Sequence, residues 1–356
     1  MNRLMTWRAL RPALTILLLG CSGSLWAQTG PLADNNEDVY FRNAPDAQKR
    51  VLIITGAAAS DAIRNRFRQW SFSLQDILSR DYGYGRDSIT LLFDDGPQAD
   101  NVSDTARIAG SSRREDIEAA LAQLSREMDA GDQLSIILIG HGSSSEDSAK
   151  FNIVGPDITG EEFAQLLEPF SQQDLVIVNT TSGSYEFSAD LSARGRVVLS
   201  ATRSRAERYD PMFAGYFVEA LDSHQGDRDK NMRVSVLEAY LYASQSVLGW
   251  YSDQGRLPTE RAVLDDNGDG VFSLEPGSGM SDGALAEIAY FDLPGASEEK
   301  SSSEAIALHA QMQELERSIF LLRGQKANYL EEDYWNSMEA LLIDLARKTG
   351  QYHELP

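Results

Sequence analysis

The chain has 356 residues, a formal net charge of −22 and a pI near 4.5. This acidity argues against nucleic acid as a partner, because phosphates require clustered lysine and arginine. It favours cations as partners, or it simply keeps an exported protein soluble. The only cysteine is Cys21, so no disulfide within the chain is expected.

Residues 1–27 have the layout of a secretory signal. Its basic residues come first and are Arg3, Arg8 and Arg11. The apolar run 13–19 follows and ends at Gly20, so it is shorter than the roughly 20 apolar residues of a transmembrane helix. We therefore expect an exported bacterial protein.

Two cleavage routes remain open for this signal. Residues 18–21 resemble a lipobox, and cleavage there would remove residues 1–20 and leave Cys21 as a lipidated N-terminus. Such a lipid would tether the protein to a membrane, and no other membrane contact is expected. Cleavage after Ala27 would instead release a periplasmic or secreted protein.

Residues 28–50 are predicted to be a linker, and residues 51–294 one α/β domain. Apolar runs of strand length occur at 51–55, 89–93, 134–139, 175–178 and 197–199. Amphipathic helical segments include 61–78, 114–128 and 161–167. Thr159 and Glu162 open the last of these as a capping box. The alternation predicts a mostly parallel sheet with helices on both faces.

Two polar residues follow successive strands of this predicted sheet. His141 comes just after the run 134–139, and Thr180 comes just after the run 175–178. The carboxyl ends of parallel strands lie at one edge of a sheet, where ligands bind in α/β proteins. We therefore expect His141 and Thr180 to share a rim.

A first acidic loop is a candidate calcium site. Positions 1, 3, 5, 9 and 12 of an EF-hand loop would be occupied by Asp227, Asp229, Asn231, Ser235 and Glu238. Position 6 normally holds glycine because the turn needs a positive φ, but here it is Met232. Bound calcium would tie down a long connection of the sheet.

A second acidic loop has the glycine at position 6 that the first one lacks. Positions 1, 3 and 5 would be Asp265, Asn267 and Asp269, and Gly270 stands correctly at position 6. The twelfth position is Pro276, however. The alternative for both loops is a solvated acidic turn that binds no ion. Beyond calcium, no cofactor is expected. His224, His309 and His353 lack ligand spacing, which argues against zinc.

Residues 295–303 are rich in Gly, Ser, Glu and Lys and are predicted to be a flexible linker. In residues 304–356, apolar residues recur at three- and four-residue steps on both sides of Gly324. They are Met312, Leu315, Ile319, Leu322, Tyr334, Met338, Leu341 and Leu345. We predict a helical hairpin whose stripe docks on the domain, pairs with itself or a second copy, or seats a helical partner.

Several short motifs occur in a fixed order along the α/β domain. They are Val-Leu-Ile-Ile-Thr-Gly at 51–56, Leu-Phe-Asp-Asp at 92–95, Ile-Gly-His-Gly at 139–142, Val-Asn-Thr-Thr-Ser-Gly-Ser at 178–184 and Ser-Ala-Thr at 200–202. In this order they resemble the legumain-type (asparaginyl endopeptidase) cysteine peptidases. The resemblance runs from about residue 51 to about residue 270 and implies a caspase-like fold.

In that family the histidine of the His-Gly pair is the base and a cysteine is the nucleophile, which map onto His141 and Thr180. Thr180 is therefore a departure from the family. The family also carries, after its first strand, an asparagine that orients the imidazole, whereas residues 56–59 read Gly-Ala-Ala-Ala. A threonine hydroxyl needs an oriented base and is stiff at χ1. We expect cysteine-type peptidase activity to be lost.

The preferred hypothesis is a non-cleaving peptidase homologue that binds a peptide or protein. Backbone N–H groups near Gly142 and Thr180 would offer a pocket for a carbonyl oxygen. The alternative is a hydrolase in which His141 is the base and the nucleophile is Thr180, Thr181, Ser182 or Ser184. A third reading is an assembly protein that acts through residues 304–356. The least functional reading makes His141 a strand cap and residues 180–184 a polar turn.

Overall fold

The computed structural model describes residues 47–98, 101–145, 148–277, 280–293 and 302–355. The predicted export signal, Cys21 and most of the two predicted linkers lie outside these residues. Within the described part of the chain, no helix combines the length and the apolar character needed to cross a membrane.

A six-stranded sheet forms the centre of the α/β domain, in the order β2-β1-β3-β7-β8-β9. The strands are β1 (Lys49–Thr55), β2 (Ile89–Phe93), β3 (Gln133–Ile139), β7 (Asp174–Asn179), β8 (Arg196–Ser200) and β9 (Val263–Asp265). All neighbours are parallel except β9, which runs antiparallel to β8. The predicted strands are confirmed; β9 was missed because it has only 3 residues.

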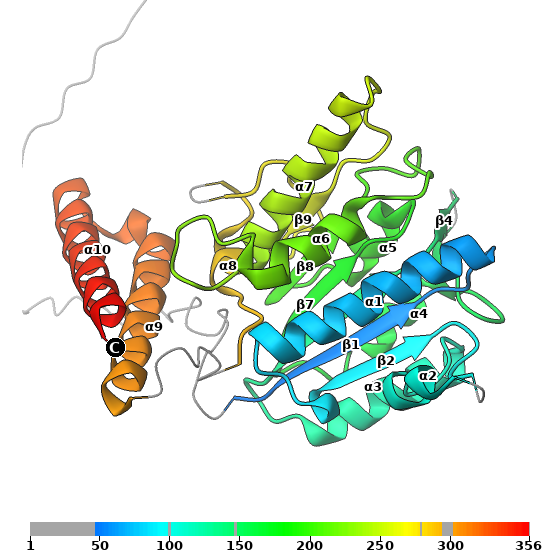
Figure 1. Ribbon diagram of the computed structural model, residues 1–356. Coiled ribbons are helices and arrows are strands. Elements are labelled where there is room, and N and C mark those ends of the chain that lie inside the picture. Colours follow the sequence, from blue (N-terminus) through cyan, green and yellow to red (C-terminus); the bar gives the residue numbers. More distant parts are fainter. Residues whose placement is uncertain (1–46, 99–100, 146–147, 278–279, 294–301, 356) are drawn as a thin grey trace, which may run out of the picture. The chain divides into compact units, whose positions relative to one another are not determined.

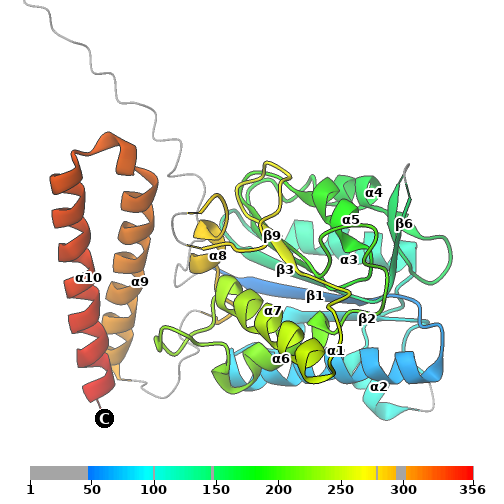
Figure 2. The same ribbon diagram turned by 90° about the horizontal axis from the view of Figure 1, so that it is seen from above.

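Helices cover both faces of the sheet (Figures 1 and 2). Along β1, Val51 and Ile53 point into one core and Leu52 and Ile54 into the other, because strand side chains alternate between faces. The first core is closed by α1 (Asp61–Asp81), α6 (Phe213–Leu221), α7 (Val236–Asp253) and α8 (Ala284–Ile288). The second is closed by α3 (Arg114–Glu127), α4 (Gly160–Leu166) and α5 (Ser184–Leu191). The predicted layered α/β architecture is confirmed.

Side-chain caps set where several of these helices begin. The Ser60 hydroxyl accepts a hydrogen bond from the Ile63 amide at the start of α1. Thr159 and Glu162 form the predicted capping box at the start of α4, and Ser235 and Glu238 form a second one at α7. Each box satisfies two backbone donors that would otherwise lack partners. A further short helix, α2, spans Val102–Arg107.

A small antiparallel sheet was not predicted. It consists of β4 (Gly142–Ser144), β5 (Ala149–Phe151) and β6 (Ile158–Thr159), and it begins directly after His141. Its strands are too short and too rich in Gly and Ser to show a clear period. The first of these strands follows the carboxyl end of β3 directly, so the small sheet borders the rim around His141.

The C-terminal helices α9 (Ser303–Gly324) and α10 (Glu331–Glu354) form the predicted hairpin. Ile319 and Leu322 of α9 pack with Tyr334 and Met338 of α10, so the predicted apolar stripe pairs with itself. The hairpin is also tied to the α/β domain. The Arg233 guanidinium lies 3.0 Å from Asp292 and 3.2 Å from Glu316 of α9.

Candidate functional site at the carboxyl edge of the sheet

His141 and Thr180 lie at the same edge of the sheet, as expected. His141 follows β3 and Thr180 follows β7, and these two strands are parallel neighbours. The Thr180 amide donates a 2.9 Å hydrogen bond to the Leu138 carbonyl, which continues the ladder past the end of β7. The register of two adjacent strands therefore brings the family's base and nucleophile positions together.

The Thr180 hydroxyl is already engaged. Its Oγ1 donates a 2.7 Å hydrogen bond to the Leu138 carbonyl, and the residue is only 3% exposed. Leu138 thus receives both the amide and the hydroxyl of Thr180. The χ1 angle of a β-branched side chain is restricted, and this bond holds the hydroxyl on the sheet rather than on the imidazole.

The other candidate hydroxyls are engaged as well. Thr181 Oγ1 donates to the Asn179 side-chain oxygen at 2.7 Å, and Ser182 Oγ donates to the Gly142 carbonyl at 3.2 Å. Ser184 Oγ lies 2.8 Å from Ser200 Oγ and 3.0 Å from Thr202 Oγ1 in a buried hydroxyl cluster. These bonds hold the segment 180–184 to its neighbours.

Two amides of the expected pocket for a carbonyl oxygen already have partners. The Gly142 amide donates to Ser182 Oγ at 3.3 Å, and the Thr180 amide belongs to the strand ladder. A carbonyl oxygen would have to replace one of these partners or use a neighbouring amide, so the pocket stays a prediction. Gly142 itself is required for close packing, since a Cβ there would lie 2.6 Å from the Ser182 carbonyl oxygen.

An acidic partner for His141, which the sequence did not reveal, comes from the loop after β8. Asp210 Oδ1 lies 3.1 Å from His141 Nδ1. The other Asp210 oxygen, Oδ2, lies 2.7 Å from the guanidinium of Arg66 on α1. The Phe67 ring, also on α1, has its centroid 5.5 Å from that of the imidazole. His141 therefore has an acidic neighbour, although residues 56–59 lack the asparagine that orients the imidazole in the resembling family.

The second ring nitrogen of His141 has a different environment. Nε2 is buried and has no hydrogen-bond partner among the described residues. A buried ring nitrogen without a partner is costly, so it marks a position where a ligand group would be stabilised. No sequence pattern pointed to Asp210, because five strands and two helices lie between it and His141 along the chain.

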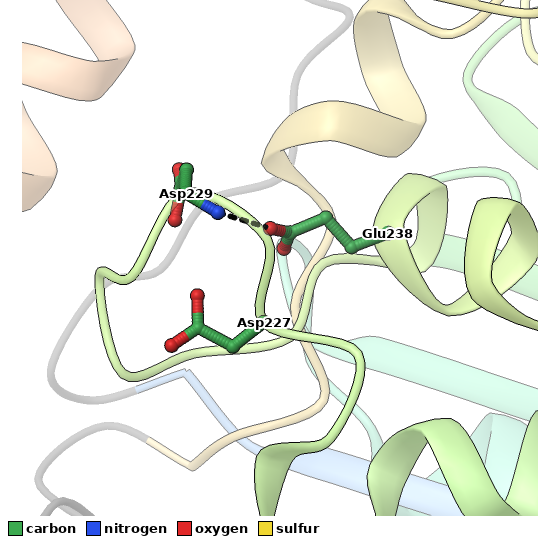
Figure 3. Close-up of side chains that lie close together, drawn as sticks. All are labelled: Asp227, Asp229 and Glu238. Atoms are coloured by element: carbon green, nitrogen blue, oxygen red, sulfur yellow. Dashed lines mark hydrogen bonds between the residues drawn. The ribbon is translucent and has the colours of Figure 1, made fainter.

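The first acidic loop brings carboxylates together as the calcium hypothesis requires. Oxygens of Asp227, Asp229 and Glu238 lie within 4.8 Å of one another (Figure 3). Met232 has φ 67°, so the sixth position takes the positive φ despite lacking glycine. Desolvation by burial, followed by the charge of Glu238, raises the pKa of Asp229 to about 6. These three residues could hold a cation.

The same carboxylates also have partners within the loop. Asp227 accepts hydrogen bonds from the amides of Lys230 and Met232, at 2.7 and 3.1 Å. Glu238 accepts from the amides of Arg228 and Ser235, and its capping role at α7 is described above. The predicted ligand Asn231 accepts from the Arg233 amide through Oδ1 at 2.8 Å. Calcium at this loop stays a prediction.

The second acidic loop has a similar backbone pattern. Asp265 accepts hydrogen bonds from the amides of Asn267, Gly268 and Gly270, at 3.2, 2.9 and 3.0 Å. Asn267 accepts from the Asp269 amide at 2.8 Å, and Gly270 has φ 75°. The loop is thus folded tightly around the Asp265 carboxylate. Calcium at this loop likewise stays a prediction.

No protein-family model matches the chain, and no curated protein sequence matches it. Similar solved structures include protein GSU0716 from Geobacter sulfurreducens, with 9% identity and a TM-score of 0.40 over 61% of this chain and 92% of that chain. The structure of drICE has 9% identity and a TM-score of 0.40 over 64% of this chain and 91% of that chain. The structure of the Drosophila initiator caspase Dronc has 12% identity and a TM-score of 0.39 over 66% of this chain and 86% of that chain. Likenesses this distant carry no conclusion about activity.

Proposed function

We propose that the chain is an exported, non-cleaving relative of the legumain-type peptidases that binds a peptide or protein at the rim around His141. One observation carries this proposal. The hydroxyls of Thr180, Thr181, Ser182 and Ser184 all bond to neighbouring protein groups, and no such bond reaches His141 within the described residues. The rim therefore offers a recognition surface without a poised nucleophile.

Energetics support the loss of cleavage. For Thr180 to attack a carbonyl, its hydroxyl would have to leave the Leu138 oxygen and rotate away from its rotamer. Giving up a bond made by a buried hydroxyl costs about 1–3 kcal/mol when nothing replaces it. A hydroxyl also needs general-base help throughout the reaction, whereas a thiol ionises readily beside an imidazole. The Cys-to-Thr departure thus removes both the reactive atom and its freedom to turn.

Binding draws on one polar atom without a partner and on one polar pair at the rim. Among the described residues, no group bonds to the buried Nε2 of His141. Ser144 of β4 donates a 3.1 Å hydrogen bond to Glu186 of α5. An extended peptide presents alternating N–H and C=O groups, and it could pair with such polar atoms while its side chains fill the rim.

The test uses purified full-length protein and a proteome-derived peptide library. Peptides retained by the immobilised protein and any cleaved products are both identified by mass spectrometry. We expect retention that falls in His141→Ala and no cleavage by the wild type. A serine- or threonine-directed covalent probe should give no labelling at 180–184. Cleavage by the wild type that disappears in His141→Ala would overturn the proposal.

A second candidate function follows from the Asp210 contact. Asp210 Oδ1 at 3.1 Å from His141 Nδ1 is the arrangement in which an acid orients a general base. A hydrolase that uses Thr180, Thr181, Ser182 or Ser184 then requires the hydroxyl to turn when substrate binds. Probe labelling of one of these residues, lost in both His141→Ala and Asp210→Ala, would favour this function over the first.

The third reading, an assembly protein acting through 304–356, makes a separate prediction. Self-pairing of α9 and α10 buries much of the stripe, but Trp335 and Leu342 of α10 remain 52% and 47% exposed. Removing the hairpin would abolish partner capture in that case and would leave peptide retention at the rim unchanged. If the protein without the hairpin still captured its partner but no longer retained peptides at the rim, this reading would be contradicted.

A further inference from the structure

The loop that carries Asp210 is held at both of its ends. It spans 201–212 and connects β8 to α6 on the carboxyl edge of the sheet. The segment after α7, at 259–261, runs beside it and contributes bonds to each end. A connection of this length without regular structure would ordinarily be mobile, so these bonds decide where Asp210 stands.

Glu207 holds the first end. Its Oε2 accepts hydrogen bonds from the amides of Arg203, at 2.9 Å, and Arg261, at 3.1 Å. Its Oε1 lies 3.1 Å from the Arg203 guanidinium. The backbone of Glu207 takes part too, because its carbonyl accepts from the Gly183 amide at 3.0 Å. Glu207 thus joins the loop both to the 259–261 segment and to the 180–184 rim.

Glu260 holds the second end. Its carboxylate accepts from the amide of Met212, at 2.9 Å to either oxygen, and from the amide of Phe213 at 3.2 Å. These are the first amides of α6, where a negative charge is favoured by the helix dipole. Glu260 is only 2% exposed and is itself bonded to the Tyr251 hydroxyl at 3.2 Å. The backbone just after Asp210 and Pro211 is therefore anchored in the core.

Between these two anchors, Asp210 lies between a cation and an imidazole. The guanidinium of Arg66 on α1 lies beside one carboxylate oxygen, and His141 Nδ1 lies beside the other. Arg66 in turn lies 5.4 Å from the centroid of the Trp70 ring. A carboxylate oxygen can only accept, so a hydrogen bond across the 3.1 Å between Nδ1 and Asp210 Oδ1 requires the proton to be on Nδ1. In a neutral imidazole the other nitrogen, Nε2, then has a free lone pair.

We propose that Asp210 is the positioning residue of His141, and that Glu207 and Glu260 hold its loop so that the imidazole stays in the Nδ1-protonated form with Nε2 bare. Resting on the proposed function, this arrangement names the chemistry of the bound group: the site takes an N–H or O–H donor from the ligand, such as a peptide amide. The imidazole acts as an acceptor there and not as a donor.

The test reads the protonation of each ring nitrogen directly. Uniformly ¹⁵N-labelled full-length protein is studied by long-range ¹H–¹⁵N spectroscopy at a pH above that of ordinary histidine titration. The chain holds 4 histidines, so His141 is assigned by the signals missing from His141→Gln. We expect a protonated Nδ1 and a bare Nε2 in the wild type. In Asp210→Ala the Nδ1-protonated form should become the minority, and in Asp210→Asn, whose amide oxygen still accepts, it should persist.

The anchors are tested in the same spectra. Glu260→Ala should loosen the loop and lower the Nδ1-protonated fraction, although Asp210 is unchanged. If that variant fails to fold, Glu207→Ala takes its place. Asp253→Asn, at an exposed position at the end of α7, is the matched control and should leave the spectrum unaltered. Thermal melts confirm that each variant is folded.

Two results would overturn the inference. One is a wild-type imidazole with its proton on Nε2; the other is a folded Asp210→Ala protein whose tautomer is unchanged. Neither depends on finding a ligand, so failure here is distinguishable from failure of the proposed function, which would show as absent peptide retention with the expected tautomer in place.

Discussion

Thr180 Oγ1 and the Leu138 carbonyl oxygen are joined by a 2.7 Å hydrogen bond at the point where two parallel strands end. The position that would carry the nucleophile in the resembling family is thereby used as a structural link between β3 and β7. A side chain that acts as a strand clamp serves the stability of the rim rather than bond cleavage.

Thr180→Val removes the clamp while keeping the shape of the side chain. We expect it to lower the free energy of unfolding by about 1 kcal/mol, the net contribution of one hydrogen bond. Urea titration measures the change. Thr105→Val is the control, because Thr105 Oγ1 makes a similar 3.0 Å bond to the Val102 carbonyl in an exposed position. An equal or larger loss in the control would contradict the role assigned to Thr180.

Gly142→Ala places a methyl group where there is no room. The added Cβ would lie 2.6 Å from the Ser182 carbonyl oxygen and 2.9 Å from Thr181 Oγ1. We expect a loss of about 1–3 kcal/mol of stability, because backbone and buried side chains must shift. Gly249→Ala is the control, since nothing lies within 4 Å of its added Cβ. A thermal melt that drops only for Gly142→Ala is the expected outcome.

Glu260 makes stability depend on pH. Desolvation by burial raises the pKa of Glu260 to about 7. Hydrogen bonds from the amides of Met212 and Phe213 lower this pKa, and the charge of Glu207 raises it. The folded state holds this proton more tightly than the unfolded chain does. The protonated Glu260 therefore stabilises the folded state fully below about pH 4.5. As the pH rises towards 7, about 3 kcal/mol of that stabilisation is lost.

Comparison of the wild type with Glu260→Gln isolates that contribution. Urea titrations between pH 4.5 and 8 should show the wild type losing stability relative to the glutamine variant across this window. The Tyr251 hydroxyl and the Glu207 carboxylate also face Glu260, so Glu207→Gln should shift the window downward. A constant difference between the two proteins at all pH values would speak against a raised pKa.

Arg233 joins two acidic groups in the core between the α/β domain and α9. Burial raises the pKa of Asp292, but the charges of Arg233 and Lys49 outweigh it, so the net pKa is lowered. Burial raises the pKa of Glu316 to about 7. We expect Arg233→Met to lower the free energy of unfolding by about 3–5 kcal/mol, because it leaves a buried carboxylate without its charged partner.

Chemical denaturation followed through the tryptophans measures the loss in Arg233→Met. Arg347→Met is the control, since Arg347 pairs with Asp344 at 3.2 Å on the surface and such pairs contribute less than about 1 kcal/mol. Similar losses in both variants would mean that burial does not distinguish the two ion pairs.

Calcium should raise the melting temperature if either acidic loop binds it. At a concentration of about 100 times the dissociation constant the gain is about 2.7 kcal/mol. Asp229→Asn, which keeps an oxygen for the Asn231 amide, should abolish the gain if the first loop is the site. Asp269→Ala should abolish it if the second loop is the site. Identical melts with EDTA and with calcium would remove the hypothesis.

Local pattern was sufficient for most of the fold. The strand 89–93 and the starts of the helices at 61 and 114 were predicted at the residues where they occur, because apolar runs and helical periodicity are set by residues a few positions apart. The hairpin was predicted from its apolar steps and Gly324. The short strands β4, β5, β6 and β9 were missed, since 2 or 3 residues carry no measurable period.

The candidate site was only partly predictable. The order of strands is enough to put His141 and Thr180 at one edge, because parallel strands end together. The engagement of the Gly142 and Thr180 amides was not predicted, since a hydrogen bond to Ser182 or Leu138 depends on the final register. Met232 also adopts a positive φ that its side chain disfavours, and only the surrounding loop explains it.

The sequence by itself determined that position 180 holds a threonine and not a cysteine, that strands and helices alternate, and that two loops are acidic, because composition and short-range periodicity are properties of the chain alone. Only the tertiary structure decided that Thr180 bonds to Leu138 and that Asp210 meets His141. Such contacts join residues whose separation along the chain is bridged by loops, and packing rather than local preference selects them.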